Sequence, residues 1–317
     1  MLWLKVIWAA LSSRSNQIFY DRISSIYDDV FVDHKIHAES MLEILNDIYT
    51  DNKHETLVLD LGCGTGILSK MLAEKDFNVV GLDISFLSLH TLRQQNKEMD
   101  IIQADANYLP IADSSFHTVV CLGVWRHFPD VQKVLNEVSR VLTNDGTFIV
   151  GYFPPDIAGA IHVKHSWYGK LLIWLYQLLT RKLGYLDRAD FKLEDETEDA
   201  AREQFKTVRK MTSGSQKNLI LARYPLKKDT TCQVVPLSNS SMKKKQVPVN
   251  HNLMRILRCP HCVSRKMHKI CKDTGRLDLI QNNWLVCQEP ECGRKYPVRD
   301  GIVVMLVEEE HDITLIT

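Results

Sequence analysis

Two patterns of apolar and polar positions, one typical of strands and one of helices, alternate over the first two thirds of the chain. Short apolar runs that end at glycine or aspartate predict buried strands, as in Thr56–Leu61 and in the run that ends at Asp83. Between these runs, residues 67–72 carry apolar side chains at helical spacing. Strands that alternate with helices are typical of an α/β fold, with a parallel sheet and helices on both of its faces. This pattern continues to about Tyr224.

The pattern changes after residue 224. Residues 225–252 are rich in Ser, Asn, Pro and Lys and show no apolar period, which predicts a flexible basic linker. A segment rich in cysteine follows from Leu253 to Thr317. The sequence therefore predicts three parts: a large α/β domain over residues 1–224, a linker over 225–252 and a small domain over 253–317.

The chain begins with an apolar run of about eleven residues that Lys5 interrupts. The run is shorter than the roughly 20 apolar residues that a membrane span needs, and its charge does not precede the apolar core as it does in a signal peptide. We expect an amphipathic first helix that packs on the core, with contact to a membrane surface as a further possibility. No other stretch predicts a transmembrane span.

Charge and cysteine content narrow the class of protein. The chain has 39 Lys and Arg against 39 Asp and Glu, which gives no support to a general nucleic-acid binder but leaves a local basic patch open. Five of its 8 cysteines lie beyond residue 258. A disulfide scaffold would spread them through a small secreted chain, so the clustering favours a local metal site in a reducing compartment, and we expect a cytoplasmic protein.

A glycine-rich turn joins the first strand to the first helix of the α/β pattern. Gly62, Gly64 and Gly66 let the backbone approach a ligand closely, and Asp83 at the end of the next strand can accept the hydroxyls of a ribose. The spacing is not the G-x-G-x-x-G of dinucleotide folds. Asp60, two residues before Gly62, would repel a pyrophosphate and suits a cationic ligand. The turn therefore predicts a site for a cationic nucleoside.

The octapeptide "LDLGCGTG" resembles the first motif of the class I S-adenosylmethionine-dependent methyltransferases. "DIIQADANYLPIADSSFHTVVC", "VLNEVSRVLTNDGTFIVGYF" and "SGSQKNLILARYP" resemble later parts of the same family, although His117 replaces the usual Asp. The resemblance covers roughly residues 17–224. It implies a Rossmann-like sheet of seven strands, S-adenosylmethionine as cofactor, and contacts from Asp105 and Ala106 to adenine. The expected cofactor-binding residues are Asp60, Gly62, Cys63, Gly64, Gly66, Asp83, Ile84, Asp105, Ala106 and Leu122.

The expected acceptor is a small, partly apolar molecule such as a quinone or lipid precursor. "FYDRISSIYDDV" resembles the opening helix of the ubiquinone and menaquinone C-methyltransferases, which implies that Tyr20 or Tyr27 closes over the cofactor; packing within the helix is the other interpretation. His127, just past the fourth strand, is the candidate general base, unless it only packs or caps. Residues 162–186, rich in Trp, Tyr and Leu, form either a core helix or a lid over the substrate.

The cysteines of the last segment fall into two close pairs, Cys259-x2-Cys262 and Cys287-x4-Cys292. Four thiolates in such pairs predict a structural zinc site with no open position for catalysis, with free thiols or a disulfide as the alternative. "YPVRDGIVVML" resembles the zinc-ribbon activator subunits of tRNA, rRNA and release-factor methyltransferases. The resemblance implies a module that docks beside the methyltransferase sheet, here within one chain.

Two other functions stay open at this point. The relatives of the zinc ribbon serve enzymes that act on RNA, so a tRNA methyltransferase with a built-in activator is the first alternative. A non-catalytic methyltransferase fold that only assembles a complex is the second, although the intact glycine turn and acids argue against it. No Asn- or Asp-Pro-Pro-Tyr follows the fourth strand, which disfavours methylation of exocyclic or amide nitrogens.

Overall fold

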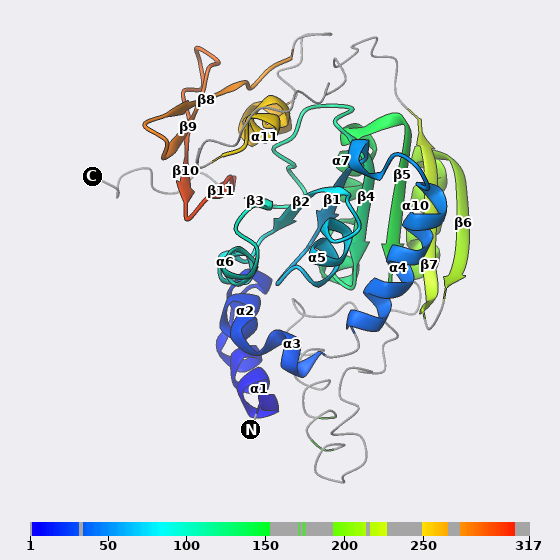
Figure 1. Ribbon diagram of the computed structural model, residues 1–317. Helices are drawn as coiled ribbons and strands as arrows, with labels where there is room; N and C mark the ends of the chain where they lie inside the picture. The colour runs from blue at the N-terminus through cyan, green and yellow to red at the C-terminus, as the bar shows by residue number, and fades with distance from the viewer. Residues whose placement is uncertain are drawn as a thin grey trace.

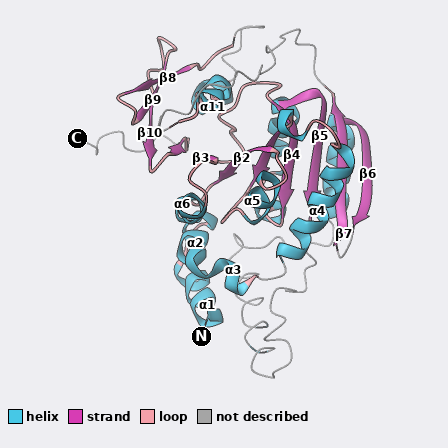
Figure 2. Cartoon of the chain, viewed as in Figure 1, coloured by secondary structure: helices cyan, strands magenta, loops and turns pink. Residues whose placement is uncertain are grey.

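The structure is a computed structural model that describes residues 2–31, 34–152, 193–213, 216–226, 249–265 and 273–307, together with Leu171 and Trp174. A single twisted sheet runs through the molecule, with helices on either side of it (Figures 1 and 2). The aromatic-rich stretch 162–186 lies outside the described residues except for Leu171 and Trp174, which are helical and exposed. Most of the expected linker, residues 227–248, also lies outside them.

The described strands form one sheet in the order β6-β7-β5-β4-β1-β2-β3-β11-β10-β9-β8. The strands β1 to β5 are mutually parallel, whereas β7 runs antiparallel to β5 and to β6. The bounds are β1 Leu57–Leu61, β2 Asn78–Asp83, β3 Asp100–Gln103, β4 Phe116–Leu122, β5 Leu142–Gly151, β6 Phe205–Ser213, β7 Gln216–Pro225, β8 Leu277–Ile280, β9 Trp284–Cys287, β10 Lys295–Arg299 and β11 Ile302–Val304.

The expectation of seven strands covers only the part from β6 to β3. Within the described residues the sheet has eleven strands, because β11 pairs in parallel with β3, and β10, β9 and β8 follow it in antiparallel order. Strand β11 covers the edge that β3 would otherwise expose, and Ile302 and Val303 of β11 are fully buried. The cysteine-bearing segment thus continues the sheet of the α/β part.

Helices cover both faces of the sheet. Their bounds are α1 Leu2–Ser12, α2 Asn16–Ile23, α3 Tyr27–Val30, α4 His34–Ile48, α5 Ile67–Ala73, α6 Phe86–Gln95, α7 Val131–Val141, α10 Leu193–Gln204, α11 His251–Ile256 and α12 Pro260–Ser264. Short 3₁₀ turns lie at Ser24–Ile26, Lys53–Glu55 and Trp125–His127. Helices α4 and α5 pack on one face, and α7, α10 and α11 pack on the other.

Strand β4 is apolar on both of its faces because helices cover both sides of the sheet. Val119 and Cys121 face the core that α7 and α10 cover, whereas Val120 faces the core beneath α4 and α5. Side chains alternate across a strand, so a strand covered on both faces is apolar at every position. The continuous apolar run in the sequence has this origin.

The predicted first helix is α1, but it does not pack on the main core. With α2 and α3 it forms a separate apolar cluster around Phe19 and Ile23, and α2 packs against α6. Figure 1 shows these three helices together at one end of the molecule. Ser15 caps α2, because its hydroxyl accepts a hydrogen bond from the Ile18 N–H. Among the described residues, no helix combines the length and apolarity needed to cross a membrane.

Candidate functional site

The glycine turn after β1 has three residues in left-handed conformation, with φ of 76° at Gly62, 54° at Gly64 and 80° at Gly66. A Cβ at Gly62 would lie 2.3 Å from Cγ1 of Val124, and one at Gly66 would lie 2.3 Å from Cδ1 of Leu92. A Cβ at Gly64 would meet no atom within 4 Å. The outer two glycines therefore permit close packing, while the middle one leaves open space in front of the turn.

Asp83 at the end of β2 is tied to this turn. Its carboxylate accepts hydrogen bonds from the backbone N–H of Gly64 at 2.9 Å and of Ser85 at 2.8 Å. Burial raises the pKa of Asp83, and these two hydrogen bonds oppose the increase. The carboxylate is thus held in a fixed position at the carboxyl ends of β1 and β2.

A cavity of about 300 Å³ opens at this edge of the sheet. Seven of the ten expected cofactor residues line it: Gly62, Gly64, Asp83, Ile84, Asp105, Ala106 and Leu122. The lining contains two carboxylates and neither Lys nor Arg. Such a wall favours a cationic ligand and disfavours a phosphorylated one.

The other three expected residues support the turn from behind. Asp60 is 2% exposed, and its carboxylate accepts a 2.5 Å hydrogen bond from the Ser69 hydroxyl. Burial, together with nearby Asp83, raises the pKa of Asp60 to about 7. Cys63 packs behind the turn beside α6, and Gly66 is the N-cap of α5. None of the three lines the cavity.

His127 lines the same cavity from the turn after β4. Its Nε2 lies 2.8 Å from the hydroxyl of Tyr20, and its backbone carbonyl accepts a hydrogen bond from the Asn16 side chain at 3.2 Å. Tyr20 and Tyr27 both line the cavity, with ring centroids 6.1 Å apart. Both tyrosines thus lie at the cavity, and the Tyr20–His127 contact adds a pair that sequence reasoning did not join.

Two acids of the N-terminal helices also hold the site, and sequence reasoning missed both. Asp21 accepts hydrogen bonds from the Ser85 hydroxyl at 2.7 Å and from the Leu87 N–H at 3.0 Å. Asp28 accepts one from Thr65, in the glycine turn, at 2.5 Å. Both lie within "FYDRISSIYDDV", so their place in that motif was the available signal. The N-terminal helices are anchored to the loops after β1, β2 and β4.

His117 shows what the departure from the family pattern does. Its Nδ1 accepts a hydrogen bond from the backbone N–H of Leu57 at 3.0 Å, which ties β4 to the start of β1. Burial lowers the pKa of His117, which favours the neutral ring that can accept this bond. The residue lies at the opposite end of these strands from the cavity, so the replacement leaves the cavity unchanged.

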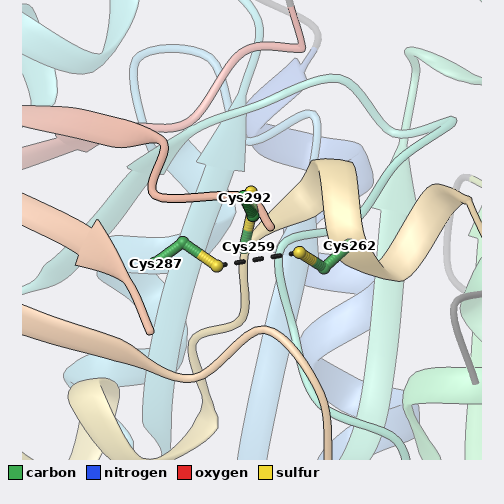
Figure 3. A group of neighbouring side chains, drawn as sticks. All are labelled: Cys259, Cys262, Cys287 and Cys292. Atoms are coloured by element: carbon green, nitrogen blue, oxygen red, sulfur yellow. Dashed lines mark hydrogen bonds between the residues drawn. The ribbon is translucent and has the colours of Figure 1, made fainter. Parts of the chain in front are cut away.

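The second candidate site lies in the cysteine-bearing segment. The sulfur atoms of Cys259, Cys262, Cys287 and Cys292 all lie within 4.8 Å of one another, and Figure 3 shows them converging on one point. The Sγ–Sγ distances are 3.7 Å for Cys259–Cys292 and 3.6 Å for Cys262–Cys287. Sulfur atoms bound tetrahedrally to zinc at about 2.3 Å are about 3.8 Å apart, so the spacing fits that ion and no disulfide.

Comparison with known proteins finds similarity to methyltransferases. Residues 59–150 match a family model described as a methyltransferase domain. The chain is 39% identical over 100 residues to an uncharacterized protein of Methanocaldococcus jannaschii, an alignment that covers 32% of this chain and 42% of that protein. It is 34% identical over 134 residues to the demethylmenaquinone methyltransferase of Thermus thermophilus, covering 40% and 61% respectively. The alignments thus span about half the length of these relatives.

A partial match is found among solved structures. It is a provisionally assigned S-adenosyl-L-methionine-dependent methyltransferase from Methanococcus maripaludis, with 19% sequence identity and a TM-score of 0.49. The match covers 67% of this chain and 94% of that one. The matched family segment begins in β1 and ends in β5, so it contains the glycine turn, Asp83, Asp105 and His127.

Proposed function

We propose that this protein is an S-adenosylmethionine-dependent methyltransferase that acts on a small, partly apolar molecule such as a quinone or lipid precursor. The observation that carries the proposal is the cavity at the carboxyl ends of β1 and β2, within a methyltransferase domain. Its lining offers two carboxylates and an open glycine turn to a ligand that is cationic and carries a ribose.

The residues present fit this cofactor. Asp83 would hold the ribose hydroxyls, and Asp105 and Ala106 would hold the adenine, while Gly62 and Gly64 leave room along the turn. Ile84 and Leu122 supply apolar walls. The absence of Lys and Arg from the lining agrees with a cofactor that has a sulfonium and no phosphate. Asp60, Cys63 and Gly66 would act indirectly, by fixing the turn.

S-adenosylmethionine supplies a methyl group that its sulfonium already activates, so the protein mainly positions the acceptor and excludes water. The N-terminal helices provide the exclusion, because Asp21 and Asp28 anchor them over the cavity. His127 is the proposed general base, and the Tyr20 hydroxyl at 2.8 Å fixes the orientation of its ring. Both side chains line the cavity and can reach an acceptor there.

Two observations support a partly apolar acceptor. Phe128 and Pro129 line the cavity beside His127, so the acceptor side of the site is largely apolar. The Thermus thermophilus relative is a demethylmenaquinone methyltransferase. An RNA acceptor remains the alternative, because the cysteine-bearing segment resembles activators of RNA methyltransferases, and the experiment below separates the two.

The four cysteines are proposed to hold one structural zinc ion. The ion would stabilise a segment too small to fold through its own core, and the segment would in turn stabilise the methyltransferase sheet by covering the edge at β3. The chain would then consist of a methyltransferase domain, residues 1–224, a linker and a docked zinc-ribbon domain, residues 253–317.

The proposal is tested with S-adenosylmethionine labelled at its methyl group, incubated with the protein and with separate lipid, RNA and protein extracts. We expect label in the lipid extract, and RNase treatment should not reduce it. Asp83→Ala should weaken cofactor binding by at least about tenfold in calorimetry, since it removes a charged hydrogen-bond acceptor. Glu74→Ala, an exposed acid at the end of α5, is the matched control. A wild-type protein that binds no cofactor would instead support a non-catalytic assembly role.

A further inference from the structure

Helix α1 is apolar on two opposite faces. Its inner face, Val6, Ala9 and Ala10, is at most 1% exposed and packs in the N-terminal cluster. Its outer face carries a stripe with i, i+4, i+7 spacing, and the exposed fractions are 51% for Leu4, 62% for Trp8 and 56% for Leu11. Three large apolar side chains in one exposed row are unusual for a surface that faces only water.

The charged side chains around this outer stripe are all basic. Lys5 and Arg14 are exposed, and the guanidinium of Arg22 lies 5.2 Å from the centre of the Trp8 ring. No acid occurs before Asp21, and Asp21 is engaged with Ser85 and the Leu87 N–H. The surface therefore combines exposed leucines, a tryptophan and basic side chains.

This combination selects one class of partner. Tryptophan favours the headgroup level of a bilayer, leucine favours the acyl boundary, and lysine and arginine favour anionic headgroups. A second copy of the chain would fit poorly, because a twofold contact through the stripe would bring Lys5, Arg14 and Arg22 of both copies together. We propose that α1 lies in the surface of an anionic lipid bilayer, with Leu4, Trp8 and Leu11 inserted.

The place of α1 in the fold gives this contact a consequence. Only residues 13–15 separate α1 from α2, and Asn16 and Tyr20 of α2 line the cavity. Figure 1 shows α1 at the end of the molecule away from β8–β10, so the cysteine-bearing segment would not obstruct a bilayer there. A bilayer at α1 would bring the cavity close to apolar molecules that are dissolved in the bilayer. Contact with a bilayer through this helix face does not require the proposed reaction.

The test is flotation of the full-length protein with vesicles of phosphatidylcholine alone or with added phosphatidylglycerol. We expect the protein to float with the anionic vesicles and the emission of Trp8, isolated by comparison with Trp8→Phe, to shift to shorter wavelength. The triple variant Leu4→Ser, Trp8→Ser, Leu11→Ser should lower the bound fraction at least about tenfold. Ile280→Ser removes another exposed apolar side chain, 46% exposed, from β8 and should change nothing.

Charge and oligomeric state complete the test. Lys5→Glu with Arg14→Glu should weaken binding to anionic vesicles about tenfold or more, while leaving any binding to neutral vesicles unchanged. Cofactor affinity measured on each variant shows that the fold and the cavity are intact, whatever the acceptor proves to be. The proposal would be overturned if wild-type protein did not float, if the triple variant floated equally well, or if the triple variant dissolved a dimer seen in gel filtration.

Discussion

Val303 of β11 lies in parallel register with Ile102 of β3, and both side chains are fully buried. The backbone N–H of Met305 then donates to the carbonyl of Gln103 at 2.8 Å, one residue before the loop that carries Asp105 into the cavity. The cysteine-bearing segment thus contacts β3 at the end from which the loop of Asp105 leaves. We therefore expect a substitution that disrupts β11 to lower the stability of the whole sheet.

Val303→Asp tests the contribution of this strand pairing. It places a carboxylate in the core between β11 and the helices beneath it, and we expect the free energy of unfolding to fall by on the order of 3 kcal/mol. Urea denaturation followed by fluorescence measures the change. Val304→Asp is the matched control, because the next side chain points to the other face and is only half-buried. Equal losses of unfolding free energy from both variants would show that burial of the Val303 side chain contributes nothing beyond that of Val304.

Metal content provides a second test. Purified protein should contain about one zinc ion per chain by elemental analysis. Cys287→Ser should abolish the zinc and lower the thermal midpoint, because the ion's binding energy stabilises the fold. His261→Ala, in the same turn as Cys259 and Cys262 but outside the four-sulfur group, should keep both zinc and stability. A zinc-free wild type with an unchanged midpoint after chelation would contradict the assignment.

The raised pKa of Asp60 predicts how stability depends on pH. Its value of about 7 in the folded protein exceeds the ordinary value of 3.8, so the folded state binds the extra proton between these limits. The stability that Asp60 contributes is complete below about pH 4 and is lost as pH rises toward 7. Asp60→Asn keeps a polar partner for Ser69 without a charge.

We therefore expect Asp60→Asn to gain stability over wild type as pH rises from 5 to 8, by on the order of 2 kcal/mol in urea denaturation without cofactor. Glu74→Gln, an exposed acid at the end of α5, should show no such gain. If the two variants depend on pH in the same way, the carboxyl of Asp60 is not the group that titrates.

The roles of Tyr20 and His127 can be distinguished by measuring kcat and cofactor affinity in single variants. In the extract fraction that accepts label, His127→Gln should lower kcat by about 10²- to 10⁴-fold, the usual contribution of a general base, while cofactor affinity stays within a few-fold. Tyr20→Phe should lower kcat less, because it removes only the hydrogen bond that orients the ring. Tyr27→Phe is the comparison variant, because it removes the hydroxyl of a second tyrosine that lines the same cavity. A large loss in cofactor affinity would point to a purely structural pair.

Local features could be predicted from the sequence because neighbouring residues fix them. The glycine turn, the strand ending in Asp83 and the paired cysteines each depend on conformations and spacings within a few residues, and seven of the ten expected residues line one cavity. Asp60 belongs to the same motif but does not line that cavity. The motif gives its position along β1, whereas the face to which the side chain points depends on the pleat.

Periodicity and spacing along the chain are enough to predict a parallel α/β sheet, a glycine-rich turn and a group of four cysteines. The folded arrangement alone shows that β11 continues the sheet at β3, that Tyr20 contacts His127, and that Asp21 and Asp28 anchor the N-terminal helices. These contacts join segments far apart along the chain. They depend on which faces and edges remain to be covered once the core has packed, and no local pattern specifies that choice.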